Sequence, residues 1–257
     1  MADLAVRWFS GRDGARLAYR ETGAGRPLVL IHGYFSSAFV NWIRYGEAEI
    51  IAARGYRVIM PDLRGHGESA RPHDPAAYPP DVLAYDGLEL IRQLGLGDYD
   101  LGGYSLGART SIRMLALGAA PGRVVIGGMG LEGVLHTGGR SEFFRRVLTA
   151  PDSFERGTAE WRAAAFLKTV NGDPVAMLRL MDTIVDTTRE QLAQITIPAL
   201  VVAGEADDDN GSAAALAAAL PDARFAVVPG THMSAVTERA LGEAIADFLG
   251  DPDRSLT

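Results

Sequence analysis

A serine stands in a glycine-flanked turn near the middle of the chain. Residues 103–107 read Gly-Tyr-Ser-Leu-Gly, the Gly-x-Ser-x-Gly pattern in which a serine hydroxyl sits on a sharp turn between a strand and a helix. A predicted strand from Tyr99 to Gly102 leads directly into this turn, and a helical pattern from Leu106 to Leu117 follows it. This context predicts that Ser105 is a nucleophile.

A serine hydroxyl is a weak nucleophile at neutral pH and needs a general base, most often an imidazole, within hydrogen-bond reach. The chain has five histidines. Four of them, His32, His66, His73 and His136, precede the last predicted strand. Only His232 follows the last predicted strand, in a loop from which it can return above the sheet. We therefore expect His232 to be the base that activates Ser105.

The imidazole in turn needs a carboxylate that fixes its tautomer and stabilises the imidazolium. A predicted strand ends at Gly204 and is followed by a run of acidic residues. Asp207 is the preferred candidate, because it stands three residues beyond the glycine and keeps the chain order serine, acid, histidine. Asp208 and Asp209 are near alternatives, and Glu132, just after the preceding predicted strand, is a further one.

Backbone N–H groups would have to stabilise the oxyanion that forms when a carbonyl carbon is attacked. Leu106 follows the serine at the amino end of a predicted helix, where the helix dipole also favours negative charge. Tyr34 follows His32-Gly33 at the end of a predicted strand, where the glycine permits a turn of the backbone. The amides of Tyr34 and Leu106 are therefore the predicted oxyanion hole.

The elements that position these residues can be read from hydrophobic periodicity. Eight strands are predicted, at 6–10, 16–20, 27–31, 57–60, 99–102, 123–129, 199–203 and 224–228. Helices are predicted at 38–53, 80–94, 106–117, 211–219 and 235–249. From the third strand onward strands and helices alternate, which predicts an α/β fold with a mostly parallel sheet and helices on both faces.

One interval interrupts this alternation. About sixty residues between Met129 and Pro198 have helical periodicity without a strand, and Asp173-Pro174 is typical of a helix start. We expect a helical lid, or cap, at 133–195, inserted between two parts of the core at 1–132 and 196–257. Its predicted substrate-binding residues are Phe143, Phe144, Trp161, Phe166, Met177 and Met181, with Phe154 nearby, although such a stripe also suits a small core of the insertion itself.

The chain resembles the α/β-hydrolase superfamily over essentially its full length. The landmarks are His32-Gly33-Tyr34, residues 61–69 (Pro-Asp-Leu-Arg-Gly-His-Gly-Glu-Ser), the Ser105 turn, and the Asp207 and His232 loops. The resemblance implies an eight-stranded sheet with a lid, a triad of Ser105, Asp207 and His232, and oxyanion donors at Tyr34 and Leu106. It assigns the Arg64 turn a structural role only.

Serine at position 105 points away from the epoxide hydrolases and haloalkane dehalogenases of this superfamily, which use aspartate there. The resemblance implies a carboxylesterase-like hydrolase of small to medium acyl esters. The alternatives are a lyase or cofactor-free haloperoxidase or perhydrolase with the same residues, and a small-ligand receptor with little or no turnover.

Composition excludes several other classes of protein. The 257 residues hold no cysteine, which rules out disulfides and thiolate chemistry, and no metal or organic cofactor is implied. The net charge of −7 argues against binding to nucleic acids or anionic membranes. We find no long apolar segment and no signal-peptide pattern, so we expect a cytoplasmic protein. The sequence leaves the oligomeric state open.

Overall fold

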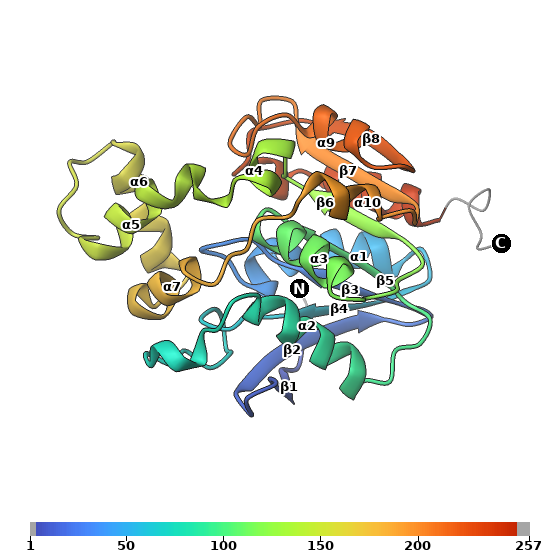
Figure 1. The fold of residues 1–257 in the computed structure, drawn as a ribbon, viewed down its shortest axis with the longest axis horizontal. Coiled ribbons are helices and arrows are strands. Elements are labelled where there is room, and N and C mark those ends of the chain that lie inside the picture. The colour runs from blue at the N-terminus through green and yellow to red at the C-terminus, as the bar shows by residue number, and fades with distance from the viewer. Residues whose placement is uncertain (1–3, 251–257) are drawn as a thin grey trace.

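Eight strands form one sheet in the computed structural model, which describes residues 4–250 except for the side chains at 137 and 139 (Figure 1). The order across the sheet is β1-β2-β4-β3-β5-β6-β7-β8. The bounds are β1 Arg7–Ser10, β2 Arg16–Gly23, β3 Arg26–Ile31, β4 Tyr56–Pro61, β5 Asp100–Tyr104, β6 Val124–Gly127, β7 Ala199–Gly204 and β8 Ala223–Val228. Strand β2 is antiparallel to both of its neighbours, and all other pairs are parallel. The predicted fold class is confirmed.

The central strands are continuous apolar runs because both of their faces are covered. Leu28 and Leu30 of β3 pack with α1 (Glu47–Ala52) and α10 (Arg239–Leu249) on one face. Val29 and Ile31 pack on the opposite face with α2 (Val82–Gln93) and α3 (Leu106–Ala116). Alternate residues of one strand therefore belong to two different cores.

The helix expected over 38–53 is interrupted. A short π-helix, η1 (Phe39–Ile43), comes first, and α1 begins only after Gly46. Gly46 has a φ of 94°, a left-handed conformation that ends one helix and lets the next begin at a new angle. The periodicity of the segment is helical throughout, so the sequence pattern alone does not reveal the break.

Helices alone fill the interval between β6 and β7 among the described residues. They are α4 (Leu131–Leu135), the 3-10 helix η3 (Thr137–Arg140), α5 (Ser141–Thr149), α6 (Ala159–Thr169), α7 (Pro174–Met181) and α8 (Arg189–Ala193). Figure 1 shows α5, α6 and α7 projecting beyond one end of the sheet. By contrast, Leu192 and Ile195 pack against strands β6 and β7. We call α5–α7 the projecting helices.

The start predicted for α7 has a clear physical cause. Asp173 accepts hydrogen bonds from the amides of Val175 and Ala176, and Pro174 occupies the first turn. The remaining elements are the 3-10 helices η2 (Pro75–Ala77) and η4 (Ala235–Thr237), and α9 (Ala213–Ala219). None of the helices within residues 4–250 is both long and apolar enough to cross a bilayer.

Candidate active site

Ser105 occupies a strained turn between β5 and α3. Its φ of 55° and ψ of −114° are rare for a residue with a side chain, and such strain is concentrated at functional sites. Only glycine fits at the positions two residues before and two residues after Ser105. A Cβ on Gly103 would lie 2.3 Å from the carbonyl carbon of Gly107, and one on Gly107 would lie 2.1 Å from the carbonyl oxygen of Ile31. The two glycines let the helix approach the sheet closely while the serine is held on the turn.

The fold brings His232 to Ser105 although 127 positions separate them in the sequence. Nε2 of His232 lies 3.0 Å from Oγ of Ser105. Nδ1 lies 3.0 and 3.1 Å from the two carboxylate oxygens of Asp207. With its Nδ1 proton donated to the carboxylate, the imidazole presents Nε2 as an acceptor for the serine hydroxyl. The three side chains thus form one hydrogen-bonded relay.

Asp207 is the acidic candidate that lies against His232. Its side chain is only 3% exposed, and it also accepts a hydrogen bond from the amide of Asp209. Asp209 itself pairs with Arg140 at 2.6 Å, and Asp208 is exposed. Glu132, the fourth candidate, accepts from the amide of Ser212, and this bond together with one from its own amide lowers the pKa of its carboxyl.

The two expected oxyanion donors flank the serine. A Cβ built on Gly33 would lie 3.4 Å from Cβ of Ser105, so the loop that carries Tyr34 passes directly beside the nucleophile turn. Among the described residues, the amides of Tyr34 and Leu106 have no hydrogen-bond acceptor. Both N–H groups are therefore left for a ligand oxygen or for solvent.

Asn41 supports this loop and was not anticipated from the sequence. Its Oδ1 accepts the amide proton of Gly33 at 3.0 Å, which fixes the His32–Gly33 peptide, next to the one that carries the Tyr34 amide. Asn41 is buried, and its Nδ2 has no hydrogen-bond partner among the described residues. It belongs to the π-helix η1, which precedes the break at Gly46. No motif in the sequence marks this position.

Two other histidines near the site are structural. The amide of Leu63 donates to Nε2 of His32, and Nδ1 of His32 donates to the carbonyl of Gly33. Burial lowers the pKa of His32 to about 4 and that of His66 to about 3, so both imidazoles are neutral at ordinary pH. His32 thus links the end of β3 to the segment after β4, and the ring of His66 lies 5.2 Å from that of His32.

The segment 61–69 fixes neighbouring loops. Asp62 accepts from the amides of Ala38 and Glu68, and the buried Arg64 pairs with Asp13 and Asp86 at 2.6 and 2.8 Å. Arg64 thus links the β1–β2 turn, which carries Asp13, to helix α2, which carries Asp86. The contacts agree with the structural role that the resemblance implies for the Arg64 turn.

The apolar residues of the projecting helices gather into one cluster with Phe35. Its buried members are Phe35, Val147, Leu148, Ala164, Leu167, Met177 and Met181, and Tyr34, Phe143, Phe144, Phe154 and Phe166 are among those that pack against it. The ring of Phe144 lies 5.1 Å from that of Tyr34, whose hydroxyl donates to the carbonyl of Met177. The aromatic residues therefore form a core of the projecting helices that continues to the loop carrying Tyr34.

Trp161 lies apart from this cluster. It is half-buried on α6, and the guanidinium of Arg156 lies 5.8 Å from its ring. Of the six residues expected to contact a substrate, Trp161 is thus the one that the apolar cluster does not include. Its role in substrate choice stays a prediction.

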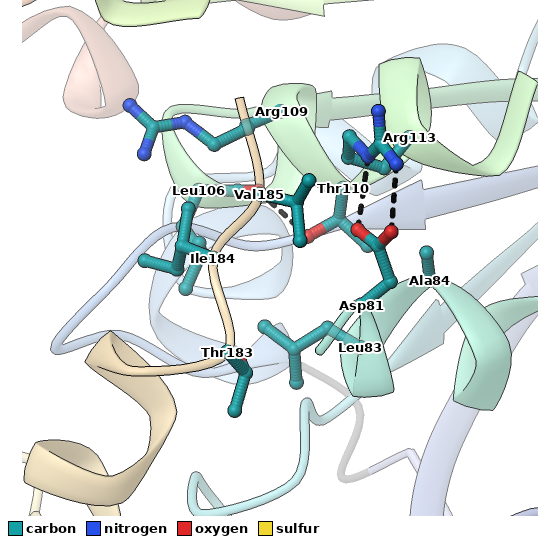
Figure 2. A pocket seen from close by; sticks show the side chains of 10 residues that line it. All are labelled: Asp81, Leu83, Ala84, Leu106, Arg109, Thr110, Arg113, Thr183, Ile184 and Val185. Carbon is teal, nitrogen blue, oxygen red and sulfur yellow. Dashed lines mark hydrogen bonds and ion pairs between the residues drawn. The ribbon is translucent and has the colours of Figure 1, made fainter. Parts of the chain in front are cut away.

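A small pocket lies beside the first turn of α3 (Figure 2). The side chain of Leu106 lines it, and Thr110 donates to the carbonyl of Leu106. On its far side Arg113 of α3 makes a bidentate ion pair with Asp81, at the start of α2. None of Ser105, Asp207 and His232 lines this pocket. The ion pair anchors α3, whose amino end carries the nucleophile turn.

Comparison with known proteins gives consistent matches. The model of the alpha/beta hydrolase family matches residues 28–246. A non-heme haloperoxidase of Rhodococcus erythropolis is 36% identical over 115 residues, 44% of this chain and 39% of that protein. Lipase 1 of Psychrobacter immobilis is 34% identical over 118 residues, 45% of this chain and 35% of that protein. The matched segments thus span well under half of these relatives.

Among solved structures, the bromoperoxidase from Bacillus anthracis superposes with a TM-score of 0.74. The two are 23% identical, and the match covers 96% of this chain and all of the other. At this level of identity the likeness concerns the fold. Within the described residues, no group of three or more histidine or acidic side chains is arranged to hold a metal ion.

Proposed function

The chain belongs to the alpha/beta hydrolase family, and we propose that it is a serine hydrolase that cleaves small to medium carboxylic esters through an acyl-enzyme on Ser105. The observation that carries this proposal is the continuous relay from Ser105 through His232 to Asp207, with hydrogen-bond distances of 3.0 Å on both sides of the imidazole. The named relatives include both a lipase and a haloperoxidase, so the family membership alone does not select the ester reaction.

In the first half of the proposed reaction, Oγ of Ser105 attacks the ester carbonyl carbon. Nε2 of His232 takes the hydroxyl proton, and Asp207 stabilises the imidazolium that results. The carbonyl oxygen becomes an oxyanion, which accepts hydrogen bonds from the amides of Tyr34 and Leu106. When the tetrahedral intermediate collapses, His232 donates the proton to the leaving alkoxide, and the acyl group stays on Ser105.

In the second half, water attacks the acyl-enzyme and His232 takes a proton from that water. The second tetrahedral intermediate uses the same two amides, and its collapse returns the proton to Oγ of Ser105 with release of the carboxylic acid. The relay lies at the carboxyl ends of the parallel strands, which is the usual place for a site in an open α/β sheet.

We further propose that residues 133–195 form a lid, within which the projecting helices bind the apolar part of the substrate. The aromatic cluster that joins Phe144 to Tyr34 supports this, because it extends apolar surface up to the loop that carries one oxyanion donor. Apolar side chains around the site would also exclude water from the acyl-enzyme until the alcohol has left.

The test is a panel of acyl esters, lactones and amides, assayed on the wild type and on Ser105→Ala. Ser111→Ala is the matched control, because Ser111 lies in the same helix and donates to the carbonyl of Gly107. We expect ester turnover in the wild type and in Ser111→Ala, and a loss of about 10⁶-fold in kcat for Ser105→Ala.

Two other outcomes would redirect the proposal. Turnover that persists in Ser105→Ala would favour a lyase or another reaction that uses His232 without an acyl-enzyme. Tight binding of a small ligand, with no turnover across the whole panel, would favour a receptor.

A further inference from the structure

Tyr104 connects the nucleophile turn directly to the loop of the base. It is the last residue of β5 and immediately precedes Ser105. Its hydroxyl donates to the carbonyl oxygen of His232 at 2.9 Å, in a buried hydrogen bond. The two rings lie 5.3 Å apart, tilted by 38°. The side chain of Tyr104 thus links the residue before Ser105 to the backbone of His232.

The Tyr104 ring is held from its other side by the end of β6. Gly128, with a φ of 58°, lies so close that a Cβ there would be 2.4 Å from Cζ of Tyr104. The amide of Gly128 donates to the carbonyl of Val202, and the carbonyl of Gly128 accepts from Asn210. These two hydrogen bonds fix the backbone of Gly128 against the Tyr104 ring. The ring is therefore confined between the β6 end and the His232 loop.

The hydroxyl of Tyr104 remains a donor at any working pH. Burial, and next the nearby carboxylate of Asp207, raise the pKa of Tyr104 well above its usual value of 10. A phenol that keeps its proton supplies no acid–base chemistry at neutral pH, but it is a permanent hydrogen-bond donor. Its chemistry suits a structural link and not a proton relay.

The hydrogen bonds of the residues around His232 do not include the carbonyl of His232, which accepts only from Tyr104 among the described residues. The amide of Thr231 donates to Oγ of Ser234, and the amide of Ala235 donates to the carbonyl of Thr231. These bonds shape the turn on both sides of His232. The carbonyl of His232 itself accepts from Tyr104, so this bond fixes the peptide at the base.

We propose that Tyr104 is a positioning residue that holds His232 in register with both Ser105 and Asp207. The inference rests on the proposed function of the relay. Because a displacement of about 1 Å in a catalytic group can cost about 100-fold in rate, the loss of this single bond affects turnover far more than substrate binding.

The test is Tyr104→Phe, which keeps the ring and removes the hydroxyl. The matched control is Tyr56→Phe, because the buried Tyr56 hydroxyl donates to the carbonyl of Leu249 at 2.8 Å, far from the relay. We expect Tyr104→Phe to lower kcat on an ester substrate by about 10- to 100-fold with little change in KM. Tyr56→Phe should leave both constants unchanged.

The pH profile separates positioning from general weakening of the fold. A loosened His232 loop also loosens the Nδ1 bond to Asp207, which stabilises the protonated imidazole. The acidic limb of the kcat/KM profile should therefore move to lower pH in Tyr104→Phe and stay in place in Tyr56→Phe. An unchanged kcat and profile in folded Tyr104→Phe would overturn the proposal.

A second perturbation covers the case in which Tyr104→Phe does not fold. Replacing Met233 by its α-hydroxy analogue turns the peptide after His232 into an ester, whose carbonyl is a weaker acceptor. The analogue keeps the side chain of Met233, which is 56% exposed, so the replacement changes the backbone alone. We expect a several-fold fall in kcat, and an unchanged kcat would contradict the role of Tyr104.

Failure of this inference is distinguishable from failure of the proposed function. Reaction of wild-type Ser105 with an organophosphonate reports on the relay as a whole. If wild-type Ser105 is labelled and Tyr104→Phe is labelled at the same rate, only the positioning role is wrong. If wild-type Ser105 is not labelled, the proposed function itself is wrong.

Discussion

Glu47 carries a buried carboxyl, and its replacement should make the protein more stable at alkaline pH. It is the first residue of α1, and neither of its carboxylate oxygens has a hydrogen-bond partner among the described residues. Gly242 of α10 packs so closely that a Cβ there would lie 3.1 Å from Cα of Glu47. Burial raises the pKa of Glu47 from 4.5 to about 8. Glu47→Gln keeps the shape and removes the charge.

The size of the effect follows from the two pKa values. Below pH 4.5 the carboxyl is neutral in both the folded and unfolded chain, so wild type and variant should have similar stability. As the pH rises towards 8, the unfolded chain releases this proton before the folded chain does, and the wild type loses stability. Each pKa unit corresponds to about 1.36 kcal/mol, so between pH 5 and 8.5 the wild type should lose about 4 kcal/mol relative to Glu47→Gln.

The assay is urea unfolding of both proteins at pH 5 and pH 8.5. The matched control is Glu49→Gln, because Glu49 is exposed on the same helix. Its free energy of unfolding should follow that of the wild type at both pH values. If Glu47→Gln shows the same pH dependence as the wild type, the reasoning from burial is wrong.

Three further predictions concern the relay, acid stability and substrate choice. Asp207→Asn should lower kcat by about 10⁴-fold in steady-state ester hydrolysis, whereas Asp208→Asn should leave it unchanged, and comparable losses in both would contradict the assignment. Burial lowers the pKa of His66 to about 3 in the folded chain, so the stability that its neutral imidazole contributes is fully present above pH 6.5 and is lost as the pH falls below that value. Acid unfolding, followed by circular dichroism, should therefore begin at lower pH in His66→Gln. Phe144→Ala should change the ratio of kcat/KM values for long and short acyl esters more than Trp161→Ala, and the reverse order would show that the aromatic cluster does not face the substrate.

The features that could be predicted from the sequence are those with local physical causes. Runs such as Leu28–Ile31 are apolar at every position because both faces of a central strand are covered. The eight predicted strands therefore lie within a few residues of the observed bounds. The Ser105 turn was equally visible, because the close approach of helix and sheet restricts two flanking positions to glycine.

The features that could not be predicted depend on contacts between distant segments. The spacing from Gly204 favours Asp207 over Asp208, but the contact of the Asp207 side chain with His232 depends on how the folded loop turns, which the spacing does not show. Asn41 contacts the loop that carries Tyr34 from the π-helix η1, and the helical periodicity of this segment does not reveal a π-helix. The bond from Tyr104 to His232 joins residues 128 positions apart, and residue spacing does not reveal it.

The most direct test of the central claim is trapping with an organophosphonate, followed by mass spectrometry of the modified peptide. The account predicts that wild type gains one phosphonyl group on Ser105, that Ser111→Ala does the same, and that His232→Ala reacts far more slowly although it stays folded. Labelling of a different residue, or labelling of Ser105 at the wild-type rate in His232→Ala, would contradict the claim that the imidazole activates this serine.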